Sequence, residues 1–208
     1  TKVILSYKNF SKNLYNVIED KNNLTIDINK KSALIYKIVE KITHKISNGG
    51  KILFCGNGGS ASDSQHLATE FLIRLKPNVN RTAIPAMSLT LDTVALTACG
   101  NDFGFDNIFS RTLEGLGNKN DVLIVISTSG NSKNIIKVLN KAKKMKIFSI
   151  GLLGKNGGRA KSMCDLSIIV NHNEVARIQE THIFLGHVIA EYVENKLIKI
   201  KKTRLIKL

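Results

Sequence analysis

Two short apolar runs, each followed by a Gly/Ser-rich loop, constrain the fold of this chain more than any other feature. The first run is KILFC (51–55), which GNGGS follows, and the second is DVLIVIS (121–127), which TSGNS follows. Apolar runs of this length, without strict polar alternation, are typical of strands buried on both faces of a parallel sheet. Each loop leads into a stretch with helical periodicity, so the sequence predicts strand–loop–helix units of an α/β fold.

The remaining segments continue this alternation of strands and helices. Further strands are expected at 83–90, 147–153 and 166–170. Helices are expected, in chain order, at 1–20, 26–47, 62–75, 92–99, 108–116, 133–144 and 176–199. We therefore predict a doubly wound parallel sheet flanked by helices. The chain is expected to form one domain, in which 1–48 is an N-terminal helical extension and 49–208 is the α/β core with a long C-terminal helix.

The composition narrows the class of protein. The chain has 208 residues, of which 43% are hydrophobic, and this excludes a disordered, collagen-like or disulfide-scaffold protein. Cys55, Cys99 and Cys164 lie far apart without a C-x-x-C pair, which predicts a reducing, cytoplasmic setting. No apolar run reaches the ~20 residues that cross a bilayer. The segment TKVILSYKNFSKN lacks the layout of a signal peptide, so none is expected.

The formal net charge of +15 raises the question of an anionic partner. Most of the excess is Lys spread along the chain, without zinc-finger spacing, an RNP-like aromatic motif or an arginine cluster. We therefore expect no nucleic-acid partner. One basic block lies at 196–207. We interpret it as a frayed or oligomer-packing end of the last helix, with a membrane-surface helix as the alternative, and we expect no membrane partner.

The loop TSGNS concentrates hydroxyl groups at the predicted start of a helix. Its hydroxyl residues are Ser127, Thr128, Ser129 and Ser132. Hydroxyls and the free N–H groups of a helix start bind a phosphate dianion well. Neither Gly/Ser loop has the Walker A or the G-x-G-x-x-G pattern. For one loop, simple helix capping would be the better interpretation, but two such loops at one edge of a sheet favour a phosphate site.

Four polar residues at helical spacing form a second candidate site. His66 and Glu70 are four residues apart, and Gln179 and His187 are eight apart, so each pair shares a helix face. Two histidines, a carboxylate and an amide oxygen would suit Zn²⁺ or a similar divalent ion. Taken singly, an exposed His–Glu pair and a hydrogen-bonded core histidine are the alternatives. The segment GNDFGF adds Asn101 and Asp102, which could bind substrate hydroxyls or begin a helix as an Asx-turn.

Taken together, four motifs resemble those of bacterial phosphoheptose isomerases, members of the sugar isomerase (SIS) domain superfamily. These are CGNGGSASDSQHLATEF, LTACGNDFGFDNIFSR, DVLIVISTSGNSKN and ARIQETHIFLGH, and the resemblance extends from the N-terminal helices to about residue 197. It implies a flavodoxin-like fold and a homotetramer with active sites at subunit interfaces. The implied reaction converts sedoheptulose 7-phosphate to D-glycero-D-manno-heptose 7-phosphate through an enediol(ate). That reaction is the first step towards nucleotide-activated heptoses of surface polysaccharides such as lipopolysaccharide or capsule.

The resemblance also implies roles for individual residues. One Zn²⁺ per subunit would be held by His66, Glu70, Gln179 and His187. The substrate-binding residues would be Asn57, Gly58, Gly59, Ser60, Glu70, Arg74, Asn101, Asp102, Ser127, Thr128, Ser129, Ser132 and Gln179. We expect Glu70 to act as the base and His187 as its acid–base partner.

One position departs from the family pattern. Ala176 stands where some family members have an aspartate before Arg-Ile-Gln, so this chain would lack one contact with the sugar. The competing hypothesis is a non-catalytic SIS protein that binds a sugar phosphate and acts through a macromolecular partner. Its loops would look the same. A binding module, however, has no chemical need for both the His66/Glu70 and the Gln179/His187 pairs, and their joint presence therefore favours the enzyme.

Overall fold

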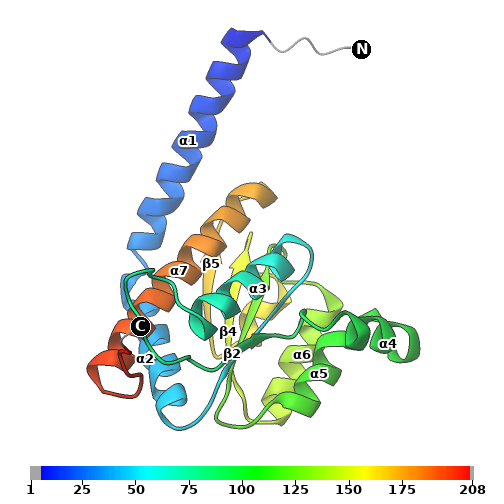
Figure 1. The fold of residues 1–208 in the computed structure, drawn as a ribbon. Coiled ribbons are helices and arrows are strands. Elements are labelled where there is room, and N and C mark those ends of the chain that lie inside the picture. Colours follow the sequence, from blue (N-terminus) through cyan, green and yellow to red (C-terminus); the bar gives the residue numbers. More distant parts are fainter. Residues whose placement is uncertain (1–5, 207–208) are drawn as a thin grey trace.

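The computed structural model describes residues 6–206, which form a five-stranded parallel sheet with helices on both faces (Figure 1). The strands are β1 (Ile52–Gly56), β2 (Ala86–Ser88), β3 (Val122–Ser127), β4 (Phe148–Gly154) and β5 (Leu166–Val170). Their order is β2-β1-β3-β4-β5, and every neighbouring pair is parallel. The direction of winding reverses between β1 and β3, and open α/β sheets bind ligands at the carboxyl edge beside such a point.

Helices cover both faces of this sheet. They are α1 (Tyr7–Asn29), α2 (Ser32–Ser47), α3 (Gly59–Leu72), α4 (Thr93–Phe103), α5 (Ile108–Leu116), α6 (Lys133–Lys144) and α7 (Val175–Lys199). Two short 3-10 helices, η1 (Phe105–Asn107) and η2 (Arg159–Ser162), complete the set. The predicted doubly wound α/β class, with N-terminal helices and a long C-terminal helix, is confirmed. Within residues 6–206 no helix is both long and apolar enough to cross a membrane.

The core has two apolar clusters, one on each face of the sheet. Phe54 and Ile124 point towards the cluster that includes residues of α2, α3 and α7. Their neighbours Leu53 and Leu123 point to the opposite face, where the cluster includes residues of α5 and α6. All residues of β1 and β3 are buried. This two-sided burial explains why their sequences are continuous apolar runs rather than alternating patterns.

Several element boundaries differ from the sequence-based prediction. The first predicted helix ended at residue 20, whereas α1 continues to Asn29 and separates from α2 only at Lys30–Lys31. The predicted helices left 21–25 unassigned, but α1 runs through this stretch, and its residues Leu24 and Ile28 are buried in the core. Burial of these side chains outweighs the low helix propensity of Asp and Asn. The predicted residues 1–5 of this helix lie outside the described part of the chain.

Three further boundaries concern segments that carry predicted site residues or lie next to them. Helix α3 begins at Gly59, three residues earlier than predicted, so Gly59 and Ser60 belong to its first turn. Helix α4 extends to Phe103 rather than 99, and strand β2 is limited to Ala86–Ser88 within the predicted 83–90. Asn101 and Asp102 therefore lie in the last turn of a helix and do not begin one.

Candidate active site

The two Gly/Ser loops lie where β1 and β3 end, next to each other at the carboxyl edge of the sheet. Strands β1 and β3 pair in parallel register up to Gly56 and Ile126, so both loops leave the sheet at the same level. A reciprocal pair of amide hydrogen bonds, each 2.9 Å, joins Asn57 of the first loop to Asn134 of α6. Asn134 is buried and was not predicted as a site residue. It ties the two loops into one unit.

The hydroxyl groups of the second loop divide into two kinds. Ser127 is buried, and its Oγ accepts a hydrogen bond of 3.0 Å from the Gly130 N–H, so it shapes the turn. Thr128 and Ser129 are half-buried beside it. Ser132 occupies the N-cap position of α6, but its side chain makes no capping hydrogen bond. Its hydroxyl and the first N–H groups of α6 are therefore placed where an anion is favoured.

A third segment, the loop after β4, closes against the hydroxyl loop. Gly130 has φ +63°, and a Cβ there would lie 2.0 Å from the Gly157 carbonyl oxygen, so only glycine fits. The Ala160 N–H donates to the Gly130 carbonyl at 2.9 Å, and the Arg159 N–H donates to Asn131 Oδ1 at 3.0 Å. This segment was not among the predicted site residues, although its Gly157–Gly158 pair is a sequence signal of close backbone contact.

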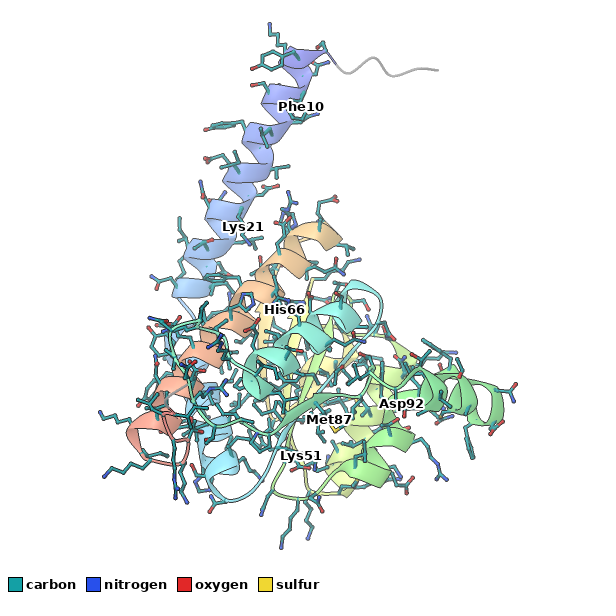
Figure 2. The ribbon with its side chains drawn as sticks, in the orientation of Figure 1. Phe10, Lys21, Lys51, His66, Met87 and Asp92 are labelled. Carbon is teal, nitrogen blue, oxygen red and sulfur yellow. The ribbon has the colours of Figure 1, made fainter. Side chains whose placement is uncertain are left out.

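His66, Glu70 and His187 form a compact group on the parallel helices α3 and α7. His66 Nε2 lies 3.0 Å from Glu70 Oε1 and 3.0 Å from His187 Nε2. One ligand atom from each residue lies within 4.8 Å of the others. Gly186 allows this approach, because a Cβ there would lie 2.4 Å from Leu67 Cδ1. Figure 2 labels His66 on α3, where that helix lies beside α7.

The surroundings tune two ionisable groups of this cluster. Burial lowers the pKa of His187, and the charge of His66 lowers it further, while Glu70 acts in the opposite direction. Both lowering effects favour the neutral form of His187, in which the imidazole has one N–H donor and one acceptor nitrogen. One turn before His66 on α3, burial raises the pKa of Asp63, with a smaller lowering effect from His66. Asp63 was not among the predicted site residues.

The donor set fits a divalent metal ion. Zinc accepts imidazole nitrogen and carboxylate oxygen at about 2.0–2.2 Å, and three protein ligands with an open position are typical of catalytic zinc. Tetrahedral ligands at such bond lengths lie about 3.3 Å apart, close to the two separations of 3.0 Å measured around His66 Nε2. His66 has a half-exposed side chain and Glu70 a mostly buried one. An ion could therefore enter from solvent.

The structure places Gln179, the fourth predicted ligand, elsewhere on α7. A Cβ on Gly59 would lie 2.3 Å from Gln179 Nε2, so this amide packs against the first turn of α3. Gln179 precedes His187 by eight residues of helix, which is about 12 Å along the axis. The structure therefore groups His66, Glu70 and His187 and places the Gln179 amide beside the first Gly/Ser loop, and its role as a fourth ligand remains a prediction.

Three other predicted substrate residues lie at the periphery of the chain. Arg74 follows α3, is exposed, and donates a hydrogen bond to Asn80 Oδ1. Asn101 and Asp102 are exposed and hydrogen-bonded to each other at 2.9 Å. Their helix α4 lies on the far side of the sheet from α1 and α7 (Figure 1). The structure does not bring these two residues to the His66 group of the same chain.

The parallel sheet, the hydroxyl loop at its switch point and the histidine–carboxylate group define an α/β protein of the SIS type. The SIS domain model matches residues 18–154, and the chain belongs to this family. Within the family it groups with the phosphoheptose isomerases. It is 48% identical over 167 residues to the phosphoheptose isomerase of Chlorobium phaeobacteroides, covering 80% of this chain and 74% of that protein. The predicted family is confirmed.

Solved structures of the same enzyme class have the same fold. The phosphoheptose isomerase of Neisseria gonorrhoeae superimposes with a TM-score of 0.82 at 36% identity, covering 89% of this chain and 99% of that one. The phosphoheptose isomerase of Francisella tularensis gives a TM-score of 0.84 at 31% identity, covering 88% and 97%. These matches extend over nearly the whole length of both solved chains.

Proposed function

We propose that this chain is a phosphoheptose isomerase that converts sedoheptulose 7-phosphate to D-glycero-D-manno-heptose 7-phosphate. The observation that carries the proposal is the convergence of His66, Glu70 and His187 from two helices of a SIS fold. The 48% identity with named phosphoheptose isomerases supports the substrate. The alternative of a non-catalytic binding protein is not favoured, because such a protein needs no grouped acid, base and ligand residues.

The reaction moves a proton from C1 to C2 and leaves the atomic composition unchanged. Glu70 removes one proton from C1 of the ketose, while His187 gives a proton to the C2 carbonyl oxygen, which yields an enediol. His187 then takes the proton of the C1 hydroxyl, and Glu70 returns its proton to C2, which yields the aldose. An imidazole has two ring nitrogens, so it can give a proton in the first step and take one in the second.

The proposed active site includes a metal ion. His66, Glu70 and His187 would hold Zn²⁺ or a similar ion, as their grouping suggests. When bound, such an ion supplies positive charge that stabilises the oxygen anion developing on the substrate. Gln179, next to Gly59, is assigned to substrate binding, and a role for it as a fourth ligand remains a prediction.

The phosphate end of the substrate is assigned to the second Gly/Ser loop. Thr128, Ser129 and Ser132 would bind the phosphate oxygens through their hydroxyls, together with N–H groups at the start of α6. Binding energy at this remote group positions C1 and C2 for proton transfer. Asn57 of the neighbouring loop would contact the sugar from its fixed place beside Asn134.

We assign the active form of the protein to a homo-oligomer. The resemblance to phosphoheptose isomerases implies that this oligomer is a tetramer. Helix α1 projects from the domain (Figure 1), and its apolar residues recur at alternating intervals of three and four. These residues are Tyr7, Phe10, Leu14, Val17, Leu24 and Ile28, with Lys21 completing the pattern. The first four are exposed, and a coiled-coil spacing of this kind needs a partner helix. Figure 2 shows Phe10 far from the sheet.

Two further observations support a second copy as the partner. An apolar groove of about 580 Å³ lies between α1, α2 and α7, and its lining includes Val39, Phe184 and Val188. Asn101 and Asp102 would reach a His66 group only from a neighbouring chain, because α4 lies beyond the sheet. We also propose a cytoplasmic location. The three free cysteines support it, because thiols stay reduced in that compartment.

The experiment that tests the function is incubation of the full chain with sedoheptulose 7-phosphate in D₂O, followed by NMR. We expect heptose 7-phosphate that carries deuterium at C2, because the abstracted proton exchanges with solvent before it returns. Treatment with a chelator should slow this turnover, and added Zn²⁺ should restore it. Saturable binding of the sugar phosphate without any turnover would overturn the isomerase and favour the binding protein.

A further inference from the structure

Arg81 is a buried cation outside the substrate and metal site, and its contacts lead back to that site. Its side chain is fully buried in the segment between α3 and β2. Arg81 Nε lies 2.5 Å from Oε2 of Glu194, a carboxylate of α7 that is also buried. Burying an ion pair is unfavourable unless the remaining polar atoms are also bonded; here all three guanidinium nitrogens have partners, whereas Glu194 Oε1 has none among the described residues. The other partners of the guanidinium therefore indicate which part of the molecule the pair stabilises.

The remaining guanidinium nitrogens bind the end of the helix that carries Glu70. Arg81 Nη2 donates to the Glu70 carbonyl oxygen at 2.9 Å, and Nη1 donates to the Ile73 carbonyl oxygen at 3.3 Å. Helix α3 ends at Leu72, so the Glu70 carbonyl belongs to the last turn, where carbonyl groups lack partners within the helix. The Ile84 N–H donates to the intervening Phe71 carbonyl at 3.2 Å. This segment thus caps the turn on which Glu70 stands.

The same guanidinium connects this turn to the second helix of the site. Glu194 follows His187 by seven residues on α7, which is two helical turns along one face. Arg81 therefore bonds to the backbone of Glu70 on one side and to the helix of His187 on the other. The spacing between the Glu70 carboxylate and the His187 imidazole depends on how these two helices are held together.

We propose that Arg81, acting with Glu194, is a positioning residue that holds Glu70 in register with His187. The proposal rests on the function proposed above, in which Glu70 transfers the proton. Arg81 touches neither substrate nor metal in this scheme, and it acts through the backbone of Glu70. Small displacements of a catalytic group reduce the rate far more than they reduce substrate binding. Loss of the Arg81 bonds should therefore lower kcat with little change in KM.

The first variant is Arg81→Lys, which keeps the positive charge but lacks the guanidinium fork. One ammonium group cannot donate simultaneously to Glu194, Glu70 and Ile73 in the observed geometry. The matched control is Lys76→Ala. Lys76 bonds to Glu191 of α7 at 2.6 Å and so joins the same segment to the same helix, but through an exposed pair. Glu194→Gln is a second variant, which keeps an acceptor for Arg81 Nε and removes the charge.

For Arg81→Lys we expect kcat per folded molecule to fall about tenfold or more, with KM within about threefold of the wild type. The kcat of Glu194→Gln should lie between those of the wild type and Arg81→Lys, and the kcat of Lys76→Ala should equal that of the wild type. Folded protein is quantified by circular dichroism and by the Tm of each variant. A wild-type kcat in Arg81→Lys, or a loss explained entirely by the unfolded fraction, overturns the positioning role. If Arg81→Lys does not fold, the kcat and KM of Glu194→Gln decide the question.

A second measurement keeps this result separate from the proposed function. The affinity of each metal-free variant for Zn²⁺ alone is measured by competition with a chromophoric chelator. Because Glu70 is one of the three grouped donor residues, its displacement should weaken Zn²⁺ binding about tenfold in Arg81→Lys and not in Lys76→Ala. If the wild type does not isomerise sedoheptulose 7-phosphate, the function fails, and the Zn²⁺ affinities still test the placement of Glu70. Equal affinities in the wild type and Arg81→Lys overturn that placement.

Discussion

The two parts of the candidate site are held in place by different means. The Gly/Ser loops are fixed by the sheet itself, through strand ends in register, a buried amide pair and backbone contacts that only glycine allows. The His66 group stands on the outer helices α3 and α7, and its position depends on how these helices pack. In the proposed function the loops bind the substrate and the helices carry the proton-transfer groups, and Arg81 and Glu194 join α7 to the last turn of α3.

The residues proposed to bind the substrate and the residues proposed to transfer protons therefore lie in different parts of the chain. In the proposed function the loop hydroxyls near Ser132 bind a phosphate remote from the reacting atoms, so their loss should appear in KM. Glu70 and His187 are proposed to act on the atoms that react, so their loss should appear in kcat. If binding and proton transfer are divided between the loops and the helices in this way, substitutions in the two parts should affect different kinetic constants.

The largest effect is expected from Glu70→Gln, which removes the base and keeps the size of the side chain. General base catalysis contributes about 10²–10⁴-fold, so kcat should fall about 10³-fold with KM changed only slightly. Steady-state kinetics with sedoheptulose 7-phosphate measures both constants. Glu191→Gln, an exposed carboxylate on α7, is the control and should leave both unchanged. A Glu70→Gln enzyme with more than about a tenth of the wild-type kcat would remove Glu70 as the base.

The reverse pattern is expected for the loop in the double variant Ser129→Ala/Ser132→Ala. Hydrogen bonds to a charged group contribute about 1.5–3 kcal/mol each, so KM should rise about 10- to 100-fold for each hydroxyl lost and more than about 100-fold in the double variant, while kcat stays within about threefold. Ser162→Ala is a matched control, because the Ser162 hydroxyl is exposed and bonds only to the Arg159 carbonyl among the described residues. An unchanged KM in the double variant would show that the phosphate binds elsewhere.

The sequence predicted the loop part better than the helix part. Strand β5 and helices α5 and α6 have the predicted bounds, because β-branched runs and amphipathic stripes are local signals. The loops follow from these strands, since parallel strands must end at one edge. The break between α1 and α2 was misplaced because it depends on burial of Leu24 and Ile28, a tertiary contact that local propensity does not record.

The contacts that organise the helix part were beyond sequence reasoning. The spacing of His66 and Glu70 on one helix was readable, but the approach of His187 depends on packing at Gly186. Arg81 and Glu194 are 113 residues apart and share no motif. The packing of Gln179 beside Gly59 was not readable from the sequence either, and its role as a metal ligand remains a prediction. Pairings between distant segments are set by the tertiary fold, whereas periodicity reports only on the segment itself.

A smaller effect, on stability, concerns His182, which lies between the two parts. It is fully buried on α7, and burial lowers its pKa to about 4, an effect partly offset by the nearby Leu153 carbonyl. The ring nitrogens make no hydrogen bond of normal geometry with the described residues. The unfolded chain takes up a proton below about pH 6.5, and the folded chain does so only near pH 4. Acidification through this window therefore stabilises the unfolded state.

We expect the free energy of unfolding to fall by about 2 kcal/mol between pH 7.5 and pH 5 on account of His182. Above about pH 6.5 its contribution should be constant. Urea unfolding at several pH values measures the slope, and the variant His182→Leu isolates the part due to this residue, because His187 contributes in the same direction. The same slope in His182→Leu as in the wild type would assign the effect to other groups.

The smallest expected quantity is a coupling energy, which tests whether the two loops behave as one unit. Asn57 and Asn134 exchange two hydrogen bonds of 2.9 Å, and Asn134 is buried, so either alanine variant leaves an amide without its partner. Each single variant should lose about 1–3 kcal/mol of stability, and the double variant should lose less than the sum. A double-mutant cycle by urea unfolding should give a coupling of about 1 kcal/mol.

KM should rise in Asn134→Ala, although Asn134 is buried behind the loops, because Asn57 would no longer be held in place. Additive losses with an unchanged KM would mean that the loops are independent, and rigidity would then arise within each loop rather than from the link between them.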